Sequence, residues 1–92
     1  MPENAEEMIR ELYRAILSLQ TEEECRDLFA DLCTYKEIEQ MAGRIRAARL
    51  LTEGKTYAQV IAETDISSAT LSRVSRCVKH GNGGYARLFE KR

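Results

Sequence analysis

The chain has 92 residues and a formal net charge of −1; 43% of the residues are apolar, 32% are charged, and there is one proline and no tryptophan. This composition is typical of one small helical domain, and it excludes collagen-like, low-complexity and wholly disordered chains. No apolar run approaches the roughly 20 residues that cross a membrane, and the acidic N-terminus lacks the apolar segment of a signal peptide. The chain has three cysteines, an odd number that does not suit full pairing into disulfides. We therefore expect a cytoplasmic protein with reduced thiols.

Two helices are predicted in the first third of the chain. Over residues 5–19, apolar side chains recur at spacings of four, four and three and form one stripe on a helix: Met8, Leu12, Ile16 and Leu19. Thr21 and Glu24 form a capping box, in which the Thr hydroxyl accepts a first-turn amide and the Glu side chain accepts the Thr amide. A second apolar stripe follows this box: Cys25, Leu28, Phe29, Leu32 and Cys33. Stripes this wide on so short a chain favour packing against a partner subunit.

The longest helix is predicted over about residues 35–53. Thr34 and Glu37 form a second capping box at its start, and Gly54 stands where a left-handed residue commonly follows a helix. One face of this helix is apolar: Ile38, Met41, Ala42, Ile45 and Ala48. Small residues allow another helix to approach it closely: Ala42, Gly43, Ala47 and Ala48.

The segment from Thr56 to Cys77 has the spacing of a helix-turn-helix. Thr56 caps a helix over about residues 57–63, three residues follow, and Ser67 caps a helix over about residues 68–79, which Gly81 ends. Asp65 stands in the turn, where it tolerates a left-handed conformation better than most residues. Apolar residues pin the helices together: Val60, Ile61, Ile66, Leu71 and Val74. A last short helix is predicted over residues 85–90, and no segment alternates like a strand, so the predicted fold class is all-α.

The second helix of this unit begins with small polar side chains, which suit the reading of DNA in the major groove. Ser67 caps the helix, and Ser68, Ala69 and Thr70 are expected to face bases. Contacts to the DNA backbone are expected from Lys55, Thr56 and Arg73, and Arg76 widens the basic surface. An ordinary helical hairpin with a Ser-rich cap is the alternative interpretation.

The charge of the chain is unevenly distributed. Residues 1–40 have eleven acidic and four basic side chains, a net charge of −7, whereas residues 41–92 have four acidic and ten basic ones, a net charge of +6. The basic half contains the helix-turn-helix, so it can meet an anionic partner although the whole chain is slightly acidic. The alternative is that the two halves neutralise each other through internal ion pairs.

Several strings of residues resemble the Trp repressor family. They are Leu32-Cys33-Thr34, Glu37, Met41-Ala42-Gly43-Arg44-Ile45-Arg46, Leu50-Leu51, Gly54 and Ala69-Thr70-Leu71-Ser72-Arg73. The strings Arg73-Val74-Ser75-Arg76-Cys77 and Gly81-Asn82-Gly83-Gly84-Tyr85 are similar to the YerC/YecD branch of Trp-repressor-like proteins. The resemblance covers roughly residues 6–90, which is nearly the whole chain.

This resemblance implies a single domain of about six helices in an intertwined homodimer. Residues 5–53 would then be the dimerising helices, residues 56–79 the helix-turn-helix, and residues 80–92 a loop and a short C-terminal helix. It also implies a sequence-specific transcriptional regulator, a repressor in the family's typical role, that binds double-stranded DNA. A helical protein-interaction module that keeps the fold without operator binding is the alternative function.

The resemblance also bears on an effector. The Trp repressor holds tryptophan between two arginines, a threonine and a serine, beside a glycine that leaves room for the indole ring. Thr34, Arg44 and Arg73 match the threonine and the arginines, but Val74 stands in place of the glycine and Cys77 in place of the serine. A β-branched side chain fills the slot, and a thiol is a weak hydrogen-bond partner, so tryptophan is not the expected ligand. Either a smaller effector binds, or Val74 fills the slot and no effector or cofactor is needed, and we favour the second alternative.

Metal binding and catalysis are not expected. Cys77 and His80 have the separation of a chelating pair, but zinc sites usually bring a close pair from each side, and Cys25 and Cys33 are eight residues apart. A lone histidine without an acidic partner does not make a hydrolytic triad. The sequence therefore predicts neither a metal site nor an enzyme.

Overall fold

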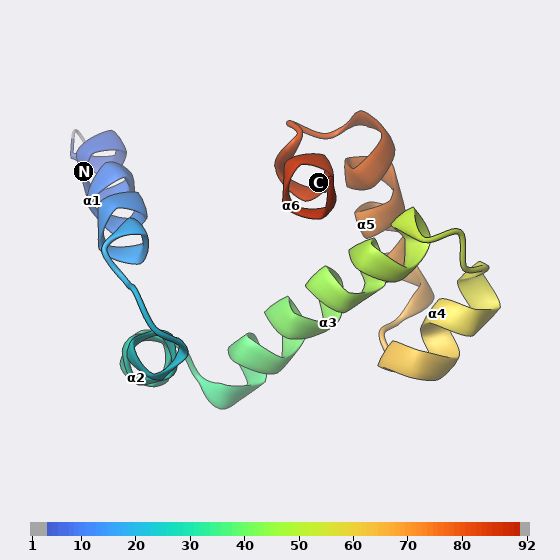
Figure 1. Cartoon of the computed structure of the whole chain (residues 1–92), viewed down its shortest axis with the longest axis horizontal. Coiled ribbons are helices and arrows are strands. Elements are labelled where there is room, and N and C mark those ends of the chain that lie inside the picture. The colour runs from blue at the N-terminus through green and yellow to red at the C-terminus, as the bar shows by residue number, and fades with distance from the viewer. Residues whose placement is uncertain (1–3, 91–92) are drawn as a thin grey trace. The chain divides into compact units, whose positions relative to one another are not determined.

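The computed structural model describes residues 4–90, and in this part of the chain there are six helices and no strand. The helices in chain order are α1 (Ala5–Leu17), α2 (Glu22–Leu32), α3 (Tyr35–Thr52), α4 (Tyr57–Thr64), α5 (Ser68–His80) and α6 (Gly84–Phe89) (Figure 1). The predicted all-α fold class is thus confirmed. Two compact units divide the chain, one extending to Tyr35 and the other starting at Lys36. Between residues 4 and 90, no helix combines the length and the hydropathy that a membrane span requires.

Helix α1 is amphipathic, and it ends two residues earlier than the sequence predicts. The hydroxyl of Ser18 donates a hydrogen bond to the carbonyl oxygen of Ala15 at 2.7 Å, a local bond of the kind by which serine competes with helix continuation. No residue of α1 or α2 is buried. Met8 is 58% exposed, Leu12 is 41% exposed and Ile16 is half-buried, so the apolar stripe of α1 is largely open to solvent in the single chain.

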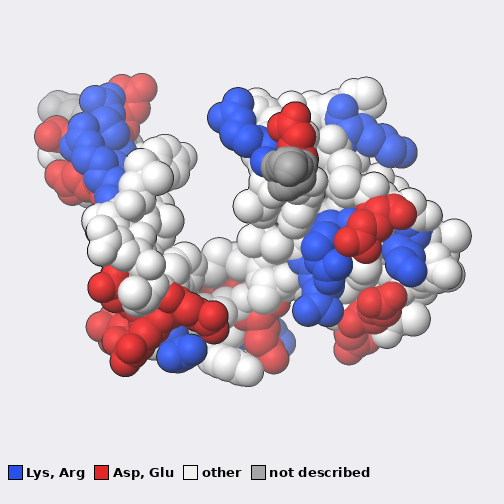
Figure 2. Space-filling model, in the orientation of Figure 1, with Lys and Arg blue, Asp and Glu red and all other residues white. Residues whose placement is uncertain are grey.

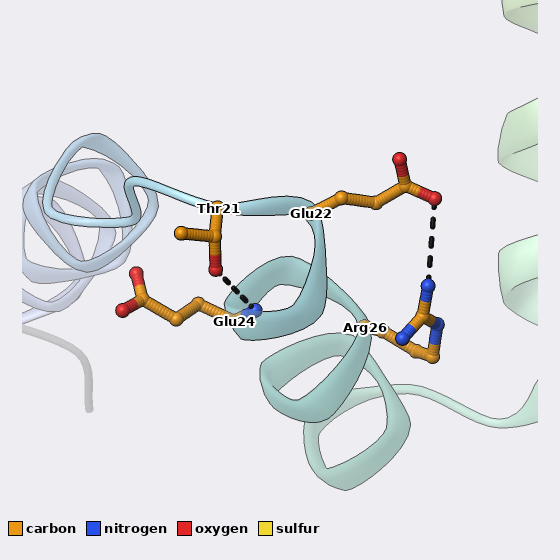
Figure 3. A network of polar contacts seen from close by, with 4 residues as sticks. All are labelled: Thr21, Glu22, Glu24 and Arg26. Atoms are coloured by element: carbon orange, nitrogen blue, oxygen red, sulfur yellow. Dashed lines mark hydrogen bonds and ion pairs between the residues drawn. The ribbon is translucent and has the colours of Figure 1, made fainter.

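Helix α2 begins at a Thr cap, as predicted, but the second half of the capping box differs. The hydroxyl of Thr21 accepts the amide of Glu24 at 3.0 Å (Figure 3), whereas the Glu24 carboxylate accepts the amide of Gln20 at 2.8 Å rather than that of Thr21. The cap thereby extends one residue further back along the chain. Glu22 and Arg26 form an exposed i,i+4 ion pair at 3.5 Å, and Figure 2 shows acidic side chains gathered over α2.

The second unit has a small hydrophobic core. Its buried members come from α3, α4 and α5, which gather around the C-terminal half of α3 (Figure 1): Ala47, Ala48, Leu50, Val60, Leu71 and Val74. Ile61 and Ile66 pack against this core, as do Tyr85 and Phe89 of α6. The predicted apolar pins of the helix-turn-helix are therefore confirmed. The predicted apolar face of α3 is confirmed at Ala48, which is buried, but it is wrong at Ala42 and Ile45, which are exposed within the chain. Ala47, predicted only as a site of close helix approach, is also buried.

Helix α3 ends in a Schellman motif. The amide of Lys55 donates to the carbonyl oxygen of Leu50 at 3.1 Å, and the amide of Gly54 donates to that of Leu51 at 3.0 Å. Gly54 has a φ of 93°, which glycine adopts without a steric penalty. This motif turns the chain sharply, so that Lys55 and Thr56 lead directly into α4.

Candidate nucleic-acid interface

A complete capping box positions the start of α4. The hydroxyl of Thr56 accepts the amide of Gln59 at 3.2 Å, and the Gln59 side chain accepts the amide of Thr56 at 2.9 Å. The backbone amides of Thr56 and Gln59, which have no partner within the helix, are thus both hydrogen-bonded by neighbouring side chains, as the sequence predicts. Lys55 precedes the cap and is exposed, so its ammonium group is free to contact an anion beside the first turn of α4.

The turn between α4 and α5 consists of residues 65–67. Asp65 has φ 61° and ψ 21°, the left-handed conformation expected from its place in the sequence, and its amide donates to the carbonyl oxygen of Ile61 at 2.8 Å. Gly43 of α3 lies against the turn, because a Cβ atom built on Gly43 would lie 3.1 Å from Cγ2 of Ile66. A side chain at position 43 would therefore require Ile66 to shift by about a few tenths of an ångström.

Two hydroxyl groups organise the first turn of α5. The hydroxyl of Ser67 accepts the amide of Thr70 at 3.1 Å and donates to the hydroxyl of Thr70 at 2.9 Å. Thr70 thereby keeps its own hydroxyl proton and one lone pair for an external partner. Ser68 and Ala69 are exposed, while Leu71 and Val74 point into the core, so α5 presents its N-terminal turn outward and its apolar side inward.

The basic residues of the predicted interface are exposed on α5. Arg73 and Arg76 are both exposed, and they lie about one turn and two turns further along α5 than Ala69. Arg49 forms an i,i+4 ion pair with Glu53 at 3.0 Å. This pair and the Arg26–Glu22 pair each join residues of a single helix, so neither links the acidic half of the chain to the basic half.

An open groove of about 690 Å³ lies beside the helix-turn-helix, between the N-terminal half of α3 and the α4–α5 turn. Side chains of both charge signs line it together with hydroxyl groups: Lys36, Glu39, Gln40, Ala42, Gly43, Arg44, Thr64, Asp65, Ile66, Ser67 and Thr70. The sequence reasoning did not identify Lys36, Glu39 and Gln40 as part of a site. Their spacing along one face of α3 with Gly43 and Arg44 is the signal that could have placed them together.

The residues matched to the tryptophan site of the Trp repressor are dispersed between the two units. Thr34 belongs to the first unit, whereas Arg44, Arg73, Val74 and Cys77 belong to the second. Val74 is 1% exposed and is part of the core, Arg44 and Cys77 are half-buried, and Arg73 is exposed. The side chain of Val74 thus contacts core residues and has almost no surface left for a ligand in this chain.

The cysteines are not paired with one another. Cys25, Cys33 and Cys77 are free thiols, of which Cys25 is exposed and the other two are half-buried. Among residues 4–90, no group of three or more His, Cys, Asp or Glu side chains is arranged to hold a metal ion.

Comparison with known proteins places these features in a family. Residues 7–92 match the family model described as Trp repressor protein. The chain is 46% identical over 81 residues to "Uncharacterized protein YerC" of Bacillus subtilis (strain 168), covering 88% of this chain and 78% of that protein.

Two solved structures share the fold. One is described as a "putative Trp repressor" from Staphylococcus aureus, with 36% identity, a TM-score of 0.86, and coverage of 96% of this chain and 91% of that one. The other is a TrpR like protein from Eubacterium eligens ATCC 27750, with 41% identity, a TM-score of 0.87, and coverage of 90% and 86%. On the family match and the identity to these relatives, the chain belongs to the Trp repressor family.

Proposed function

We propose that this protein is a sequence-specific DNA-binding transcriptional regulator that acts as a repressor. The observation that carries the proposal is the first turn of α5, where a Ser67 cap presents the exposed side chains of Ser68 and Ala69 and the hydroxyl of Thr70. Side chains of this size reach base edges in the major groove when the helix N-terminus enters it. A regulator of this kind acts on the chromosome, so its site of action is the cytoplasm.

Different residues have different tasks in this proposal. Ser68, Ala69 and Thr70 face bases, with Ala69 small enough to lie against a thymine methyl group. Lys55, Thr56 and Arg73 contact the DNA backbone, and Arg76 extends the basic surface along α5. The net charge of +6 over residues 41–92 supports this arrangement, since phosphate contacts supply much of the affinity for DNA.

The active form in this proposal is a homodimer. Helix α1 leaves large apolar side chains exposed within the single chain: Met8, Ile9, Leu12, Tyr13 and Leu17. Contiguous apolar surface of this kind marks an interface rather than a solvated face. A second copy of the chain would cover it and would place two α5 helices on one duplex, so the operator is expected to be a palindrome with half-sites about one helical turn apart.

No small-molecule effector is required in this proposal. The burial of Val74 in the core supports the view that its side chain occupies the slot that an indole ring would need. A protein that lacks this slot regulates through its own concentration or through a different ligand.

The experiment that tests the proposed function is in vitro selection of the purified protein on fragmented genomic DNA of its own source, at near-physiological salt. Enrichment of a palindromic sequence supports a dimeric operator reader. If no sequence is enriched, the selection is repeated in the presence of a cell metabolite extract. A second selection without enrichment would contradict the proposal.

A helical protein-interaction module remains the second candidate, because the exposed apolar residues of α1 could equally meet a different protein. The two candidates differ in salt dependence. Affinity of a DNA reader for duplexes falls steeply with salt, whereas the interaction module binds no duplex at any salt concentration.

A further inference from the structure

We propose that Asp65 restrains DNA binding: its carboxylate repels backbone phosphates and lowers the affinity for every duplex. This inference rests on the proposed DNA-binding function and adds a residue that opposes it. The opposing charge lowers the sequence-independent part of the affinity, on the operator and on other duplexes alike.

The charge of Asp65 is not needed to stabilise the turn between α4 and α5. Its left-handed backbone, with φ 61°, is the one positive-φ conformation at a non-glycine residue among the described residues. The hydrogen bond that closes the turn is made by the backbone amide. Within residues 4–90, the carboxylate makes no hydrogen bond or ion pair. Glycine would adopt this backbone more easily and asparagine about as easily, so the turn does not require a carboxylate.

The position of Asp65 brings its charge close to the proposed reading surface. Asp65 lies three residues before Ser68, and consecutive Cα atoms are about 3.8 Å apart, so the two Cα atoms are at most about 11 Å apart. Asp65 also lines the same groove as Ser67 and Thr70. A DNA strand that reaches the first turn of α5 therefore brings its phosphates near this carboxylate.

The charges that line the groove balance one another. Lys36 and Arg44 line it together with the carboxylates of Glu39 and Asp65, so two cations and two anions give the groove no net charge. In this it differs from the whole basic half of the chain, whose net charge is +6. Removing the charge of Asp65 would leave the groove with a net positive charge beside the reading helix.

The size of the effect follows from Coulomb's law. One carboxylate about 7 Å from one phosphate, in a surrounding with the dielectric constant of water, weakens binding by roughly threefold. The repulsion is screened by salt, because the Debye length falls from about 10 Å at 0.1 M to about 3 Å at 1 M ionic strength. If the restraint exists, removing the charge of Asp65 therefore increases the affinity for DNA, and this increase becomes smaller as the salt concentration rises.

The test compares Asp65→Asn with the wild type in fluorescence anisotropy titrations on two duplexes, the selected operator and a random sequence. Asparagine keeps the shape of the side chain and tolerates the left-handed backbone, so only the charge changes. We expect Asp65→Asn to bind both duplexes roughly twofold tighter at about 50 mM salt, where screening already reduces the unscreened threefold effect, with the gain approaching unity near about 500 mM.

Two further variants separate charge from backbone strain and from net charge. Asp65→Gly removes the charge and relaxes the turn, and we expect it to match Asp65→Asn in affinity. Glu63→Gln removes one negative charge from an exposed residue of α4 that does not line the groove, and we expect a smaller gain than for Asp65→Asn.

The possible results have separate meanings. If the wild type binds DNA and Asp65→Asn gains no more than Glu63→Gln, the restraint is refuted while the proposed function stands. A loss of operator affinity in Asp65→Asn would also overturn the restraint, because it would assign the carboxylate to a base contact such as the cytosine amino group. If neither the wild type nor Asp65→Asn binds any duplex, the proposed function and the restraint both fail. Binding by Asp65→Asn alone would support the restraint.

Discussion

The substitution Val74→Gly tests whether the side chain of Val74 occupies the space that a planar ligand would need. Val74 is 1% exposed and belongs to the core with Leu71 and Val60. Removing its three side-chain carbons costs about 2.4 kcal/mol in transfer free energy at about 0.8 kcal/mol per carbon. Glycine in a helix adds roughly 0.4 kcal/mol relative to valine, and the cavity adds about 1 kcal/mol more. We therefore expect the free energy of unfolding to fall by about 4 kcal/mol.

The assay is urea unfolding followed by circular dichroism at one fixed protein concentration, since a dimer's apparent stability depends on concentration. Each variant is measured with and without tryptophan at about 1 mM, a concentration at which a ligand with a tenfold lower Kd would add about 1.4 kcal/mol. We expect tryptophan to leave the wild type unchanged and to stabilise Val74→Gly, which lacks the side chain that the family resemblance places in the indole slot.

Val60→Gly is the matched control, because Val60 is an equally buried valine in the same core but on α4. It should lose a similar free energy of unfolding and gain nothing from tryptophan. Stabilisation of the wild type by tryptophan would refute the reasoning, because it would show that the Val74 side chain leaves room for the ligand. If Val74→Gly does not fold, Val74→Ala, which should cost about 2 kcal/mol, replaces it in the same comparison.

Four further predictions concern the interface and the fold. Thr70→Val removes the hydroxyl that Ser67 orients, and repeated selection should show that discrimination at one base pair falls by about 1–3 kcal/mol; an equal loss on every sequence would contradict a base contact. Lys55→Ala should weaken binding to all duplexes alike and reduce the slope of log affinity against log salt by about 1, whereas an altered base preference would argue against a phosphate contact. Leu12→Asp places a charge on the exposed apolar stripe of α1, and sedimentation equilibrium should then show a monomer; a retained dimer would place the interface elsewhere. Gly54→Ala meets no atom within 4 Å of the added Cβ, but its φ of 93° is unfavourable for alanine, so urea unfolding should show a loss of about 1–2 kcal/mol; unchanged stability would mean that the Schellman turn relaxes.

Much of the secondary structure was predictable because its signals are local. The Thr56–Gln59 capping box, the Ser67 cap and the left-handed Gly54 depend on residues no more than five positions apart, so both partners of each hydrogen bond can be identified from neighbouring residues alone. Two local signals failed in detail, the end of α1 and the Thr21 box. Both candidate amides, those of Gln20 and Thr21, lie within reach of Glu24, and the sequence pattern does not distinguish between them.

Only the part of the candidate site that consists of consecutive residues was predictable. Ser67, Ser68, Ala69 and Thr70 follow one another along the chain, so their joint presentation at the start of α5 follows from one helix cap. The opposite wall of the groove, with Lys36 and Glu39, comes from a helix about thirty residues earlier in the chain. Its place beside the turn depends on the contact between Gly43 and Ile66, which no periodicity along the chain reveals.

The sequence by itself determined that this protein is all-α, where its helices begin, and that a capped helix-turn-helix lies in its basic half, because helix periodicity, caps and charge are properties of neighbouring residues. Only the tertiary structure decided how the apolar residues of α3 divide between core and surface. Ala47 and Ala48 are buried because the helices that cover them approach closely, whereas Ile45, more hydrophobic than either alanine, stays exposed in the single chain. Burial is a property of how helices meet, and residues far apart in the chain set that geometry together.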